Sequence, residues 1–107
     1  MKTFSQKTAW GTIMDGLFLT DLQTLQVCRM EEGCPEPCCT AAVKLPGLLI
    51  GEVAIKNYSE NQGILDALVL AGIVKEPHRY IWQDRVRFPV CILNKNVAHK
   101  YLWGEPT

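Results

Sequence analysis

The chain lacks the features of an exported, membrane-spanning or strongly charged protein. The segment after Met1 contains no apolar stretch of the kind found in signal peptides, and no run approaches the roughly 20 apolar residues of a membrane-spanning helix. Eleven basic residues balance eleven acidic ones, so no long-range field attracts nucleic acid or anionic lipid. We therefore expect a soluble cytoplasmic protein that contacts no membrane, and we do not expect nucleic acid among its partners.

Residues that serve hydrolytic catalysis are scarce. The only serines are Ser5 and Ser59, and Ser59 is better explained as a helix cap. His78 and His99 stand in segments without a local catalytic signature, and the scattered glycines do not form a phosphate-binding loop. We therefore assign no catalytic residue and no organic cofactor, and we do not expect an enzyme.

The length and composition are those of one globular domain. The chain has 107 residues, of which 48% are hydrophobic and 21% are charged. A chain of this size buries about two-thirds of its unfolded surface, which is enough for one hydrophobic core without disulfides. We expect a single domain over residues 1–107.

The clearest local pattern is a capped helix. Ser59 and Gln62 have the spacing of a capping box, in which both side chains satisfy backbone groups at the helix start. Gly72 stands where a left-handed residue ends the helix, and Ile73 is the apolar residue that then contacts Leu68. The apolar face of this helix is expected to contain Ile64, Leu65, Leu68, Val69 and Ala71.

Several segments have the alternation or the turn residues of β-strands. Asp15–Gly16 lies between apolar flanks and predicts a tight hairpin turn, and Leu48–Lys56 predicts a strand. Leu22–Met30 fits a strand or a helix, and we favour the strand because the segment contains poor helix formers. Two prolines in Glu31–Pro37 predict a loop.

Two further strands are expected nearer the C-terminus. Tyr80–Trp82, followed by Asp84, has the pattern of a strand and a tight turn. In Val86–Ile92 the apolar residues Val86, Phe88, Val90 and Ile92 alternate strictly, so these four should face the core. Pro89 points the other way and indicates an edge strand or a bulge. The apolar tail Val97–Trp103 is expected to pack back on the protein or to meet a partner.

Strands outnumber the one secure helix, and their connections are short. Short connections favour antiparallel pairing, because parallel strands need a long crossover. We therefore predict an α+β fold with a mostly antiparallel, or mixed, sheet of about five to six strands. One principal helix, at about residues 60–71, is expected to pack on one face of this sheet.

The cysteines form the first candidate site. Cys34 and Cys38 are separated by three residues, a gap that zinc sites accept, and Cys28 could supply a third thiolate. His78 would have to reach the site from elsewhere in the fold. The chain has an odd number of cysteines, five, and no export signal, so we expect mostly reduced thiols. A zinc site, a redox-active pair and free thiols all remain open.

A second candidate site is basic. Arg85 and Arg87 flank a core-facing residue, and Arg79 could join them across a hairpin. With Tyr80 and Trp82 nearby, these arginines could hold an anion or single-stranded nucleic acid through phosphate contacts and stacking. Acidic neighbours and the neutral total favour a solvated strand face instead.

A third candidate is a subunit interface. Leu70 falls among the polar residues of the predicted helix, and Leu102 and Trp103 lie near the C-terminus. An apolar patch with an aromatic anchor is typical of a subunit contact, and two-fold homodimers are the commonest soluble assembly. We therefore expect a homodimer that uses these three residues.

These patterns favour a small binding or interaction protein, with a protein partner or a small apolar ligand. The alternative is a thiol- or zinc-dependent protein centred on Cys34 and Cys38. A short single domain without a catalytic signature is also typical of small proteins carried on mobile genetic elements, but no property is transferred from that similarity.

Overall fold

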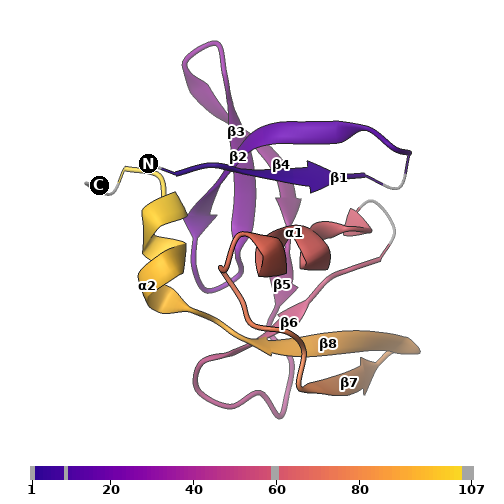
Figure 1. Ribbon diagram of the computed structural model, residues 1–107. Helices are drawn as coiled ribbons and strands as arrows, with labels where there is room; N and C mark the ends of the chain where they lie inside the picture. Colours follow the sequence, from indigo (N-terminus) through magenta and orange to yellow (C-terminus); the bar gives the residue numbers. More distant parts are fainter. Residues whose placement is uncertain (1, 9, 59–60, 105–107) are drawn as a thin grey trace.

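The strands in the described part of the chain form two antiparallel sheets of four strands each; Figure 1 shows their arrangement. The computed structural model describes residues 2–8, 10–58 and 61–104. In the first sheet each strand pairs with the next along the chain, as short connections dictate. Its strands are, in order, β1 (Phe4–Lys7), β2 (Ile13–Asp21), β3 (Gln26–Glu31) and β4 (Cys34–Thr40).

The second sheet has the order β5-β6-β8-β7, so β8 lies between two strands that precede it in the chain. Its strands are β5 (Ala42–Val43), β6 (Glu52–Ile55), β7 (Arg79–Gln83) and β8 (Val86–Ile92). The helices are α1 (Ile64–Leu70) and α2 (Lys95–Ala98), and a 3₁₀ turn at His99–Tyr101 follows α2. In the part of the chain that the structure describes, no helix is long and apolar enough to cross a membrane.

One core joins the two sheets, α1 and the C-terminal segment. Successive strand residues point to opposite faces, so Leu17 and Leu19 of β2 enter this core together while Phe18 points away from it. Ile64 and Leu68, one helical turn apart, enter it from α1, as the predicted apolar face requires. The second sheet contributes Ala42, Val53, Ile55 and Cys91.

The predicted α+β class with antiparallel pairing is confirmed, but the prediction of one sheet with five to six strands is wrong. The first sheet ends at β4. The buried residue Ala41 then carries the chain into β5, and its N–H bonds to the carbonyl of Leu25 (3.1 Å), which belongs to the turn before β3. This one-residue link divides the strands between two sheets.

Asp15–Gly16 does not form the predicted hairpin turn, because the pair lies inside β2. The register between β1 and β2 gains one residue on β2 at this point, which makes a β-bulge. Gly16 has the positive φ (77°) of such a bulge, and the Ser5 hydroxyl and the Gly16 N–H both donate to the Asp15 carboxylate. A bulge and a turn need the same left-handed backbone, so an Asp-Gly pair suits both.

The predicted loop at Glu31–Pro37 is also wrong, because β4 begins at Cys34. Glu32 and Gly33 have φ values of 51° and 80°, which makes a two-residue turn between β3 and β4. The prolines of β4 are tolerated because β4 is an edge strand, where a missing N–H can face solvent.

The strand expected within Leu22–Met30 is confirmed from Gln26 onward, where β3 begins. The residues before it form a turn. The Asp21 side chain stabilises this turn by accepting hydrogen bonds from the Gln23 N–H (2.8 Å) and the Thr24 hydroxyl (3.1 Å).

The predicted end of the helix is confirmed, but its predicted start is wrong. Gly72 has a φ of 79°, its N–H bonds to the Val69 carbonyl, and the Ile73 N–H bonds to the Leu68 carbonyl, which together form a Schellman motif. Helix α1 begins at Ile64, not near residue 60, and has Gly63 as its N-cap. Ser59, the predicted cap, lies outside the described residues.

The first N–H groups of α1 bond to Asn57 instead. The Asn57 Oδ1 atom accepts from the N–H groups of Gly63 (3.2 Å) and Leu65 (3.1 Å). An acceptor six residues before the helix N-cap therefore takes the place of a local capping box.

The strand expected at Leu48–Lys56 is shorter than predicted. β6 begins at Glu52, and Leu49 and Ile50 are exposed in the preceding loop. Positive φ at Gly47 (89°) and Gly51 (86°) turns the chain on both sides of this apolar pair, which ends the extended structure there.

Strand β8 confirms the strand predicted at Val86–Ile92 but differs in two details. It pairs with both β6 and β7, so Pro89 is not on an edge strand. The ladder with β6 covers Val90–Ile92 only, so Pro89 has no partner on β6. Cys91 enters the main core, whereas Phe88 and Val90 are buried on the opposite face of the sheet.

The tail packs back on the protein. Ala98 and Tyr101 are buried in the core, and Leu102 forms a parallel bridge with Leu19 of β2. This return places the described ends of the chain close together (Figure 1).

Candidate ligand-binding pocket

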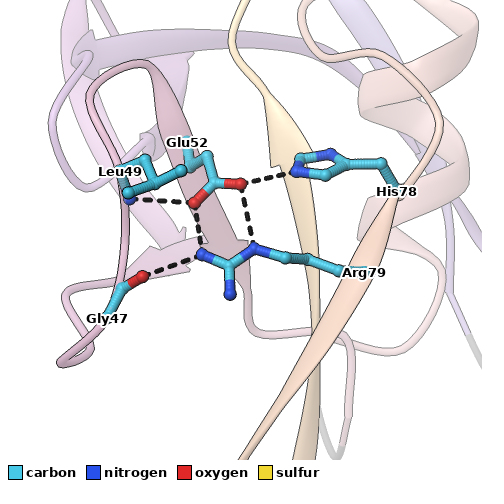
Figure 2. Close-up of polar contacts among 5 residues, drawn as sticks. All are labelled: Gly47, Leu49, Glu52, His78 and Arg79. Atoms are coloured by element: carbon cyan, nitrogen blue, oxygen red, sulfur yellow. Dashed lines mark hydrogen bonds and ion pairs between the residues drawn. The ribbon is translucent and has the colours of Figure 1, made fainter.

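A polar cluster at the edge of the second sheet joins β6 to β7. Arg79 donates to both carboxylate oxygens of Glu52, from Nε to Oε2 (3.0 Å) and from Nη2 to Oε1 (2.5 Å). His78 Nε2 lies 2.5 Å from the same Oε2 atom. Figure 2 shows the carboxylate held between the guanidinium group and the imidazole ring. The two carboxylate oxygens of Glu52 thus have three side-chain contacts between them, which satisfy much of their hydrogen-bonding capacity.

These contacts shape the ionisation of Glu52. Its side chain is only 3% exposed, whereas the side chains of Arg79 and His78 are 37% and 39% exposed. The hydrogen bonds from Arg79 and then from the Leu49 N–H lower the pKa of Glu52 from 4.5 to about 2. Glu52 is therefore ionised at neutral pH, and its charge is matched by Arg79.

The same cluster holds the β5–β6 loop in place. Arg79 Nη2 also donates to the Gly47 carbonyl (2.8 Å), and the Leu49 N–H donates to Glu52 Oε1 (2.8 Å; Figure 2). The Glu52 N–H donates in return to the Leu49 carbonyl (3.0 Å). A surface loop that would otherwise be mobile is thus tied to the sheet at several points.

This loop forms one wall of a pocket of about 410 Å³. The other walls are the turn between β2 and β3 and the segment that leads through α2. The volume lies within the range of small-molecule sites. The apolar side chains that line the pocket are Leu22, Val43, Leu48, Val53 and Leu93.

Three basic side chains stand at the exposed rim of the pocket: Lys44, Lys95 and His99. Lys44 Nζ donates to Gln23 Oε1 (3.2 Å), and none of the three forms a salt bridge with a described carboxylate. Glu52 is the one acidic residue among those that line the pocket, and Arg79 already matches its charge. The rim therefore favours an anion over a cation.

A second hollow, of about 470 Å³, lies between β1 and α1. Its charged lining residues, Lys7 and Asp66, balance each other, so the groove has no preference for one sign of charge. Leu70 lines it, together with Ile13 of β2. The pocket beside Glu52 is the more specific site because its charges do not cancel.

The structure does not bring the three predicted zinc ligands together. Cys34 and Cys38 are four residues apart on β4, which separates them by about 13 Å at the rise of an extended strand. Cys28 is buried beside Cys38, since it pairs with Pro37 across the β3–β4 ladder. Within residues 2–8, 10–58 and 61–104, no group of three or more histidine, cysteine or acidic side chains could hold a metal ion.

The thiols differ in environment. Burial raises the pKa of Cys38 and raises that of Cys91 to about 12, whereas Cys34 is exposed. A raised pKa means less thiolate at neutral pH, so Cys38 and Cys91 lack the property that makes a cysteine reactive.

The three arginines predicted to share one face do not do so. Arg79 pairs with Val90 and points to one face of the sheet, where it contacts Glu52. Arg87 pairs with Trp82 and points to the opposite face, and Arg85 lies in the β7–β8 turn. The predicted strand and tight turn around Asp84 are confirmed, but strand alternation separates the arginines.

The predicted interface residues have different surroundings. Leu70 is 90% exposed. Leu102 packs against the core, and the Trp103 ring stacks on Phe18 (centroids 5.4 Å apart), although 45% of Trp103 stays exposed. Leu70 is therefore available to a partner, whereas Leu102 and most of Trp103 are engaged within the chain.

Comparison with protein-family models, with curated proteins and with solved structures finds no match to this chain. The site is therefore assigned from its own geometry. The sequence alone did not indicate Lys44, Glu52 or Lys95 as site residues, and it gave no role to His99. These residues lie on three segments that only the fold brings together, and no local spacing marks them.

Proposed function

We propose that the protein is a small binding protein whose pocket takes a small organic anion with an apolar body. The observation that supports this proposal is the combination of an apolar wall with an unbalanced basic rim at Lys44, Lys95 and His99. The wall would bury the apolar part of the ligand, and the rim would attract its charge.

Hexanoate is a suitable probe, with hexanamide as its neutral counterpart. Isothermal titration calorimetry at low salt should detect saturable binding of hexanoate and weaker binding of hexanamide, because only the carboxylate interacts with the rim. Lys95→Gln and Lys44→Gln should each weaken hexanoate binding by about two- to fivefold, the range expected of exposed ion pairs.

Lys100→Gln is the matched control. Lys100 is exposed, follows the rim residue His99, and does not line the pocket. The Lys100→Gln variant removes one positive charge near the pocket but none from its lining, so hexanoate affinity should equal that of the wild type within error. Equal binding of acid and amide, or equal losses in all three variants, would contradict the proposal.

A further inference from the structure

Among the residues that the structure describes, three of the four sheet edges have features that hinder pairing with another chain. β4 contains two prolines, and β5 has only two residues. The last residue of β1 is approached closely by the start of α1, where a methyl group added to Gly63 would collide with the Lys7 carbonyl. β7 (Arg79–Gln83) is the remaining edge, and it contains neither proline nor lysine. Figure 1 shows β7 at the outer rim of the second sheet.

The backbone of β7 presents unpaired groups at this edge. Asp84 and Arg85 form a two-residue turn with φ values of 50° and 66°, so Gln83 and Val86 close the hairpin as a hydrogen-bonded pair. Hydrogen-bonded pairs alternate along an antiparallel ladder. The N–H and C=O groups of Tyr80 and Trp82 therefore point away from β8, toward the open edge.

The side chains of these two residues are also exposed. Tyr80 is 50% exposed and Trp82 is 68% exposed. They lie two residues apart and so share one face of the strand. The Arg87 guanidinium carbon lies 4.4 Å from the centre of the Tyr80 ring, which limits the motion of that ring before any partner arrives.

We propose that β7 pairs antiparallel with β7 of a second copy of this chain, about a two-fold axis at Ile81. In this register Tyr80 faces Trp82 of the second copy, and the outward N–H and C=O groups of both residues are used. The two ladders of four strands would become one sheet of eight strands. In this register the outward N–H and C=O groups of Tyr80 lie opposite those of Trp82 in the second copy, so none of these groups is left without a partner.

The sequence of β7 suits pairing with itself. Tyr80 would pack on Trp82 of the second copy in both halves of the interface, and aromatic cross-strand pairs stabilise sheets. Arg79 would face Gln83, so no like charges oppose each other. Both copies use the same strand, so the contact closes after two chains and does not extend into a fibre.

Sedimentation velocity over a range of concentrations up to millimolar tests the dimer. The wild-type protein should show a concentration-dependent dimer. Trp82→Lys places a charge on the edge and should raise the dimer dissociation constant by about tenfold or more. Tyr80→Pro removes one outward N–H without removing a hydrogen bond within the monomer, and it should also raise the dimer dissociation constant.

Leu70→Glu is the control, since Leu70 is exposed but lies on α1. It should leave the dimer intact. A wild-type protein that stays monomeric throughout overturns the proposal, as does a dimer that Leu70→Glu abolishes and Trp82→Lys does not. If circular dichroism shows Tyr80→Pro to be unfolded, Trp82→Lys alone decides.

Cross-linking tests the register. Ile81→Cys in a Cys34→Ser background would place two cysteines opposite each other in a non-hydrogen-bonded pair, a spacing that accepts a disulfide. Mild oxidation should give a dimer linked through position 81, detected by peptide mass spectrometry. Absence of that link in a protein that still dimerises, or capture of an unrelated extended peptide at β7 without self-association, contradicts the proposal.

Discussion

Glu52 and Arg79 form a two-pronged ion pair across an intervening strand. Glu52 belongs to β6 and Arg79 to β7, and β8 lies between them in the sheet. The pair spans the face of β8 near Val90 and Ile92, which oppose Arg79 and Glu52 in the two ladders. Arg79 also donates to the Gly47 carbonyl. The same side chain therefore joins β7 to β6 and to the loop that forms one wall of the pocket.

The first prediction concerns stability in acid. The pKa of Glu52 is lowered in the folded protein from its ordinary value of 4.5, which also applies to the unfolded chain, to about 2. Between these values the unfolded chain binds more protons than the folded protein, so the stability from this group is complete above pH 4.5 and is lost as pH falls toward 2. Urea unfolding from pH 6 down to about pH 2 should show this loss in the wild-type protein.

Glu52→Gln is the matched variant for this experiment. The amide does not titrate, so the difference in unfolding free energy between the wild type and the variant should shrink as pH falls. A difference that stays constant over the same range would show that Glu52 has no depressed pKa in the folded state.

The second prediction compares two leucines of α1. Leu68 is fully buried and Leu70 is 90% exposed. Leu68→Ala should therefore cost about 2–5 kcal/mol of unfolding free energy through the cavity that it leaves. Leu70→Ala should stay within about 0.5 kcal/mol of the wild type. A neutral Leu68→Ala with a severe Leu70→Ala would mean that the helix is rotated relative to the core.

The third prediction concerns the start of α1. Asn57→Ala removes the acceptor for two backbone N–H groups, those of Gly63 and Leu65, and should cost about 0.5–2 kcal/mol, as the loss of a helix cap does. Asn57→Asp keeps the acceptor oxygen and should recover most of that loss. Thermal unfolding of both variants makes the measurement, and equal destabilisation by alanine and aspartate would contradict the capping role.

The fourth prediction concerns the thiols. Cys34 is exposed, whereas Cys91 is buried with a pKa raised to about 12. A thiol reagent at pH 8 should therefore modify Cys34 rapidly in the native protein, and Cys91 only after unfolding. Peptide mass spectrometry identifies the modified residues. Protection of Cys34 by added zinc, with metal retained on gel filtration, would favour the alternative of a metal protein.

Local backbone chemistry predicted the parts of the fold that depend on neighbouring residues. Gly72 and Ile73 mark the end of α1 correctly because a Schellman motif closes within six residues. The start of α1 was not predictable in this way, because its acceptor, Asn57, lies outside the helix and reaches it only through the fold.

Where one local geometry serves two structures, the sequence does not choose between them. Asp15–Gly16 suits a bulge as well as a turn, and the prolines of β4 are compatible with a strand once that strand is at an edge. In both cases a turn or loop was predicted where the structure has a strand. Both strands depend on pairing with residues elsewhere in the chain, which a local sequence pattern does not indicate.

The candidate site was less predictable than the fold. The ion pair joins Glu52 to Arg79, which are far apart in the sequence, and the pocket adds Lys44 and Lys95 from two other segments. None of these residues has a motif around it. Arg79 was noted for its charge, but its role depends on the strand order, which places β8 between β6 and β7.

The most direct test of the binding proposal is a nuclear magnetic resonance titration of the ¹⁵N-labelled protein with hexanoate. Saturable shifts should appear at the amides of Gly51, Leu93 and Lys95, which line the pocket from two sides, and hexanamide should produce smaller shifts at the same positions. Absence of saturable shifts there, or shifts confined to the groove beside Leu70, would contradict an anion-binding pocket at this site.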